Sequence, residues 1–65
     1  MLKINAKCEN EFIGKSLSEF LKAKNYNISH IAVELNKEIV PKDRYDTTIL
    51  KSGDILEIVT FVRGG

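Results

Sequence analysis

The fold is decided by the stretch Ser16-Leu17-Ser18-Glu19-Phe20-Leu21, which carries the signals of one amphipathic helix. Ser16 and Glu19 have the spacing of a capping box, in which each side chain bonds the other residue's backbone amide at the start of a helix. Leu17, Phe20 and Leu21 stand at i, i+3 and i+4 and form one apolar stripe. This stripe predicts a helix that packs one side against the rest of the molecule.

Strand patterns lie on both sides of this helix. Alternating and apolar runs predict strands at 2–5, 7–12, 31–35, 38–40 and 55–62. Asn5-Ala6 and Asn36-Lys37 are the candidate hairpin turns, and Pro41 ends the fourth strand because it has no amide to donate. One helix cannot cover two faces of a sheet, so we predict an α+β fold with one solvated sheet face.

The second predicted strand contains the chain's one cysteine. Lys7, Glu9 and Glu11 share one face of this strand, while Cys8 and Phe12 share the other. We expect the charged face to lie in water. Cys8 is then expected on the inward face as a small core residue, in preference to a role as a persulfide carrier.

Size and composition restrict the function. The chain has 65 residues, 43% apolar and 29% charged, with a formal net charge of +1. This describes one small globular domain with little room for a catalytic cleft, so we expect a substrate or carrier of larger enzymes and not an enzyme. Interleaved charges without a basic stripe argue against a nucleic-acid partner. The absence of an apolar run of signal or membrane length predicts no membrane association and a cytoplasmic location.

Other polar residues give no pattern of a catalytic or metal site. One cysteine provides neither a disulfide framework nor metal-ligand spacing. We expect a structural or solvated role for His30 and a solvated loop for Lys42, Asp43 and Arg44, and we predict no bound metal.

Three segments carry a resemblance to a known family: 33–41, 53–59 and Phe61-Val62-Arg63-Gly64-Gly65. They are similar to the ThiS family of sulfur carriers in thiamine biosynthesis, and the similarity extends over essentially the whole chain. The resemblance implies a ubiquitin-like β-grasp, with a mixed sheet of four to five strands and one helix packed on one face. It implies a β-grasp domain at 1–62 and a flexible Gly-Gly tail at 63–65.

The resemblance also implies a chemistry at the tail. An E1-like adenylyltransferase would use ATP to adenylate Gly65, sulfur from a persulfide donor would convert the adenylate to a thiocarboxylate, and thiazole synthase would take the sulfur. The carrier would hold no permanent cofactor and would be a monomer when free. Gly64 and Gly65 lack side chains, which suits threading into a narrow channel of another protein.

The last strand suggests where a partner docks. The resemblance places Leu56 and Ile58 inward, so Val59 and Phe61 would stand on the open sheet face beside the tail. An exposed apolar patch there predicts a docking surface. The other interpretation is a central strand that is buried on both faces.

Three other functions stay open from the sequence. The first is a sulfur carrier of another pathway, of the molybdopterin type. The second is a ubiquitin-like modifier joined to lysines through Gly65, which Arg63 favours because many ThiS-like chains have a small or apolar residue there. The third is a β-grasp interaction domain whose tail has no chemical role.

Overall fold

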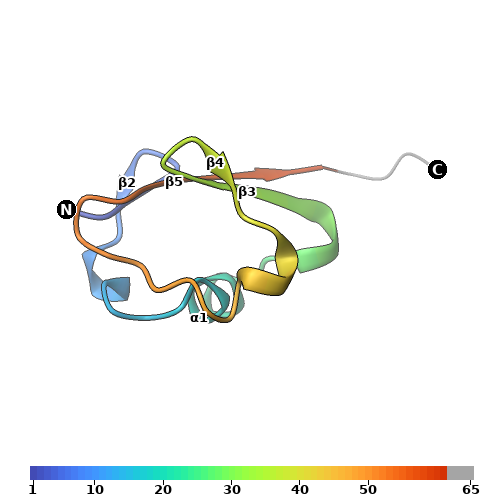
Figure 1. Cartoon of the computed structure of the whole chain (residues 1–65), viewed down its shortest axis with the longest axis horizontal. Coiled ribbons are helices and arrows are strands. Elements are labelled where there is room, and N and C mark those ends of the chain that lie inside the picture. The colour runs from blue at the N-terminus through green and yellow to red at the C-terminus, as the bar shows by residue number, and fades with distance from the viewer. Residues whose placement is uncertain (62–65) are drawn as a thin grey trace.

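The computed structural model describes residues 1–61, which form two layers: a five-stranded sheet and one helix beneath it (Figure 1). The helix is α1 (Leu17–Ala23). The strands are β1 (Lys3–Ile4), β2 (Lys7–Cys8), β3 (Ile31–Leu35), β4 (Glu38–Ile39) and β5 (Ile55–Thr60). Short 3₁₀ helices are η1 (Asn10–Phe12), η2 (Ile28–His30) and η3 (Lys42–Arg44). The predicted domain border at residue 62 and the 63–65 tail lie outside the described residues.

The sheet order is β2-β1-β5-β3-β4, so the last strand of the chain lies at the centre. β5 runs parallel to β1 and antiparallel to β3, and the two outer pairs are antiparallel hairpins. Both edge strands have only two residues, which leaves few unpaired backbone groups for unwanted strand addition. The predicted α+β fold, with a mixed sheet and one helix on one face, is confirmed.

Two hairpin turns use residues with positive φ. Asn5 and Ala6 have φ of 51° and 68°, and Asn36 and Lys37 have φ of 51° and 72°. Two successive positive φ values give the turn type whose twist matches paired strands, and asparagine tolerates this region well. The structure therefore confirms both predicted turns, although neither contains glycine.

The helix begins as its capping box predicts. The Ser16 hydroxyl accepts from the Glu19 amide at 3.1 Å, and the Ser16 amide donates to Glu19 Oε1 at 2.9 Å. The hydrogen bond from the Ser16 backbone amide lowers the pKa of Glu19. The apolar stripe is buried beneath the sheet, in a core made of Leu2, Ile4, Leu17, Phe20, Leu21, Ile31, Val33, Tyr45, Leu50, Leu56 and Ile58.

The second strand is shorter than predicted, and its faces are reversed. The two-residue Asn5-Ala6 turn places Lys7 opposite Ile4 and Cys8 opposite Lys3, and the Glu9 amide continues this register by donating to the Leu2 carbonyl at 2.9 Å. Leu2 and Ile4 face the core whereas Lys3 is exposed, so Cys8 takes the outer face and Glu9 the inner face. The chain then enters η1, where Asn10 Oδ1 accepts from the Leu2 amide at 2.9 Å. Cys8 is therefore exposed and Glu9 is 9% exposed, so the prediction of Cys8 as a core residue is wrong.

Lys24 compensates for the burial of Glu9. Its ammonium lies 3.6 Å from Glu9 Oε1 and 5.8 Å from the centre of the Phe12 ring. Phe12 in turn meets Phe20 edge to face, with ring centres 4.9 Å apart. The carboxylate thus has an opposite charge beside it, as a buried charge requires.

The long connection before β5 is held by Tyr45 and by a turn. Tyr45 is 3% exposed and anchors this connection in the core, and burial raises the pKa of its phenol. The turn that precedes β5 has Gly53 at φ 94°, and Asp54 Oδ2 accepts from the Lys51 amide at 3.0 Å. This turn sets the start of the central strand.

Candidate functional site

The central strand β5 leads directly to the predicted reactive tail. Gly64 and Gly65 lie outside the described residues. The last described residue, Phe61, is still tied to the sheet, because its amide donates to the His30 carbonyl at 2.8 Å. β3 pairs with this strand as far as Thr60, whereas β1 pairs only with its first two residues, so β3 holds the end of β5 that leads to the tail.

The two faces of β5 differ as predicted. Leu56 and Ile58 are 0% and 6% exposed and pack on the core, whereas Val59 and Phe61 are 61% and 41% exposed. The strand is therefore not buried on both faces. The role of Val59 and Phe61 in docking stays a prediction.

An apolar patch surrounds these two residues on the open face. Ala32 of β3 pairs with Val59, and Ile39 of β4 and Ile55 at the start of β5 are 65% and 52% exposed. We call Ala32, Ile39, Ile55, Val59 and Phe61 the open-face patch. α1 covers the opposite face of the sheet, and within residues 1–61 no helix covers the patch (Figure 1). An exposed apolar area of this kind is typical of a surface that binds another protein.

Two carboxylates within the same face were missed by sequence reasoning. Glu34 of β3 and Glu57 of β5 are direct cross-strand partners, and both are exposed. Their position depends on the pairing register between two strands that are far apart in the sequence. A local pattern shows only that each is a polar residue on the outer face of its strand.

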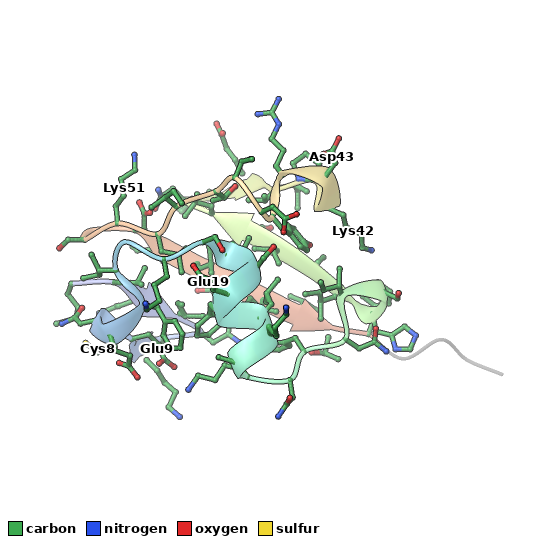
Figure 2. All side chains as sticks on the ribbon, turned by 90° about the horizontal axis from the view of Figure 1, so that it is seen from below. Cys8, Glu9, Glu19, Lys42, Asp43 and Lys51 are labelled. Carbon is green, nitrogen blue, oxygen red and sulfur yellow. The ribbon has the colours of Figure 1, made fainter. Side chains whose placement is uncertain are left out.

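Cys8 lies away from this site. β2 forms the edge of the sheet farthest from β3 and β4, and Cys8 pairs there with Lys3. Figure 2 shows Cys8 beside Glu9, at the end of the sheet where η1 begins. Its exposure makes the thiol accessible.

The remaining polar candidates take structural or solvated positions. His30 Nδ1 lies 3.3 Å from the Asn27 side-chain nitrogen, at the start of β3. Lys42, Asp43 and Arg44 form η3 and are exposed, and Asp43 points away from the body in Figure 2. Among the described residues no cluster of three His, Cys, Asp or Glu could hold a metal ion, and no helix is long and apolar enough to cross a bilayer.

Comparison with known proteins places this geometry in a family. The sequence profile of the ThiS family matches residues 2–65, which includes the open-face patch and the Gly-Gly tail. The chain belongs to the ThiS family. This ThiS-family chain superimposes on the crystal structure of the thiamine biosynthesis protein ThiS from Geobacter metallireducens with a TM-score of 0.77, 30% identity, and coverage of 98% of this chain and 97% of that one. The ubiquitin-like β-grasp that the resemblance implied is thereby confirmed.

Two curated relatives extend the comparison. The sulfur carrier protein ThiS of Bacillus subtilis strain 168 is 51% identical over 35 residues, which cover 54% of this chain and 53% of that protein. A thiazole synthase from Paramagnetospirillum magneticum is 38% identical over 64 residues, which are 98% of this chain. The ThiS-family chain spans only a fifth of that thiazole synthase, since the match covers 20% of its length.

Proposed function

We propose that this ThiS-family chain is a sulfur carrier in thiamine biosynthesis, and that it carries sulfur as a thiocarboxylate on Gly65. The observation that carries the proposal is the family match over residues 2–65, which runs through Gly64 and Gly65. The similarity to the Bacillus subtilis sulfur carrier protein ThiS supports the same function.

The proposed chemistry begins by activating the terminal carboxylate. A carboxylate is a poor electrophile because its negative charge repels nucleophiles. In the active site of an E1-like enzyme, a Gly65 oxygen attacks the α-phosphorus of ATP, and pyrophosphate leaves. The product is an acyl adenylate, in which AMP is a good leaving group.

Sulfur then replaces AMP. The terminal sulfur of a protein persulfide attacks the Gly65 carbonyl carbon, AMP departs, and an acyl disulfide forms. A second thiol attacks this disulfide at the donor's sulfur, so the donor leaves in a new disulfide and Gly65 keeps the sulfur as a thiocarboxylate. Thiazole synthase then receives that sulfur. The carrier needs no bound cofactor in this scheme, because ATP is consumed by the partner.

The partner assignment rests on the relatives. The thiazole synthase of Paramagnetospirillum magneticum contains a segment that is 38% identical to this chain over 64 residues. A domain of this kind is therefore covalently attached to the rest of that protein. Covalent attachment raises the local concentration of two parts that work together. We therefore infer that the free carrier docks on thiazole synthase through the open-face patch, with Val59 and Phe61 nearest the tail. A reducing, ATP-rich cytoplasm suits both steps.

Intact-mass spectrometry tests the loading chemistry. The chain is incubated with the E1-like enzyme of its own organism, ATP, a persulfide donor and a reducing thiol. We expect a mass increase that corresponds to one oxygen replaced by one sulfur. A variant that lacks Gly65 is the control, and it should remain folded and unmodified. Loading of that variant, or no loading of the intact chain, would refute the proposal, and conjugates to lysine side chains would instead identify a modifier.

A further inference from the structure

Glu34 and Glu57 form an unfavourable pair on the open sheet face. They are directly opposite in the β3–β5 register, and side chains at such positions have their Cβ atoms about 4.5–5.5 Å apart. Like charges at this spacing destabilise a sheet. The free protein therefore gains no stability from this arrangement.

Within the described part of the chain, no basic side chain neutralises the pair. Within residues 1–61, no Lys, Arg or His nitrogen lies within 4.0 Å of either carboxylate. Lys3, the basic residue of β1 on the same face, pairs with Ile55 and not with Glu57. By contrast, two other carboxylates have partners within the chain: the Lys24 ammonium lies 3.6 Å from Glu9, and Glu19 accepts from the Ser16 backbone amide in the cap of α1.

The pair lies inside the open-face patch and not at its margin. Ile39 is the cross-strand neighbour of Glu34 on β4. Along β5, Glu57 stands between Ile55 and Val59, each two residues away and thus about 6.8 Å distant. A protein that covers Val59 and Phe61 over a standard area of about 800 Å² per partner must also cover both carboxylates.

Covering the pair removes water from two negative charges. Burial of an unpaired carboxylate is strongly unfavourable, so a stable complex needs an opposite charge at this position. Residues 1–61 offer no opposite charge there, so we expect the partner to supply it.

We propose that Glu34 and Glu57 together accept an arginine or lysine side chain of thiazole synthase, which projects from an apolar surface that covers Val59 and Phe61. This inference rests on the docking partner proposed above. The paired carboxylates would then decide which enzyme surfaces can bind, since a neutral or acidic surface would leave them buried and unpaired.

A binding titration combined with thermal melts tests the proposal. The wild-type chain, the double variant Glu34→Gln/Glu57→Gln and the single variant Glu38→Gln are each titrated into the thiazole synthase of the same organism, at low and high salt. Glu38 is the matched control, because it is an exposed β4 carboxylate that pairs with Leu35 and so faces the other side of the sheet from Ile39.

We expect the double variant to bind roughly 10-fold or more weakly and to show a shallower salt dependence. Its melting temperature should stay the same or rise, because the repulsion is gone. Glu38→Gln should bind within about twofold of wild type. Unchanged affinity of the double variant, or a marked fall in its melting temperature, would overturn the proposal. If the wild-type chain does not bind thiazole synthase at all, the partner assignment and this inference both fail. The proposed sulfur loading of Gly65 would not be affected by that result, because it is measured separately by intact mass.

Discussion

The side-chain amide of Asn5 hydrogen-bonds both backbone groups of Ile58. Its Nδ2 donates to the Ile58 carbonyl at 3.2 Å, and its Oδ1 accepts from the Ile58 amide at 2.7 Å. β1 ends one residue earlier, at Ile4, and Asn5 turns away with φ 51°. The side chain therefore replaces the peptide group that a longer β1 would have presented to the central strand.

This relationship predicts the effect of two substitutions at one position. Asn5→Ala removes both hydrogen bonds and places alanine at positive φ, so we expect it to lower the free energy of unfolding by about 2–3 kcal/mol. Asn5→Gly removes the same bonds but tolerates the φ, so its cost should be about 1–2 kcal/mol. Urea unfolding of the three proteins measures both values. A glycine variant as stable as wild type would mean that the bonds to Ile58 contribute nothing.

Phe61 should matter for binding more than for folding. Because its side chain is 41% exposed, Phe61→Ala should lower stability by less than about 1 kcal/mol. In the complex, an aromatic anchor often contributes 2 kcal/mol or more, so affinity for the E1-like enzyme and for thiazole synthase should fall roughly 30-fold.

The control for Phe61 is Ile13→Ala. Ile13 has a similar exposure of 39%, and the segment between η1 and α1 lies beneath the sheet, away from the open face (Figure 1). The control should bind normally. Normal binding of a folded Phe61→Ala protein would remove Phe61 from the docking surface.

Cys8→Ser should leave both stability and sulfur loading intact. The thiol is exposed on an edge strand, and surface substitutions of this kind usually change stability by less than about 0.5 kcal/mol. Thermal melts and intact-mass analysis after loading measure the two properties. Loss of loading in a folded Cys8→Ser protein would show that this thiol takes part in the sulfur transfer.

Tyr45 should make the fold sensitive to alkali. Burial raises the pKa of its phenol in the folded state, so the unfolded chain loses this proton first as the pH rises. The contribution of Tyr45 to the unfolding free energy is therefore complete below its ordinary pKa of 10.0, and it is lost as the pH rises through the higher pKa of the folded state. The fall in unfolding free energy between about pH 7 and about pH 10.5 should be smaller in Tyr45→Phe than in wild type. An equal fall in both proteins would assign the effect to other groups.

Motifs formed by residues close together in the sequence predicted the helix and the turns, but they did not predict how the strands pair. The helix was predictable from Ser16, Glu19 and the apolar stripe, and the hairpins were predictable from the two asparagine turns. Each of these motifs depends on residues only a few positions apart. The faces predicted for Cys8 and Glu9 were wrong, because the prediction did not take the register of the preceding hairpin into account. Because Asn5-Ala6 is a two-residue turn, Lys7 lies opposite Ile4 and Cys8 lies opposite Lys3, and this register directs Cys8 outward and Glu9 inward.

The site was predictable in part. Both faces of the last strand are largely apolar, so the family resemblance was needed to place Leu56 and Ile58 inward; alternation then predicted the exposure of Val59 and Phe61. The opposition of Glu34 and Glu57 was not predictable in that way, because it depends on the β3–β5 register. The hydrogen bonds of the Asn5 side-chain amide were also not predictable, because their partner Ile58 lies 53 residues away along the chain.

The central place of β5 has a consequence for synthesis. A ribosome makes the chain from the amino end, so β1 and β3 must wait, unpaired along their inner edges, until β5 joins them. Pairing of β1 with β5 bridges about fifty residues, and contacts so far apart in sequence form late in folding. The surface formed by β3, β4 and β5 does not exist before that moment. An enzyme that recognises this surface therefore selects molecules whose last strand has been made and inserted, and nascent or truncated chains escape activation.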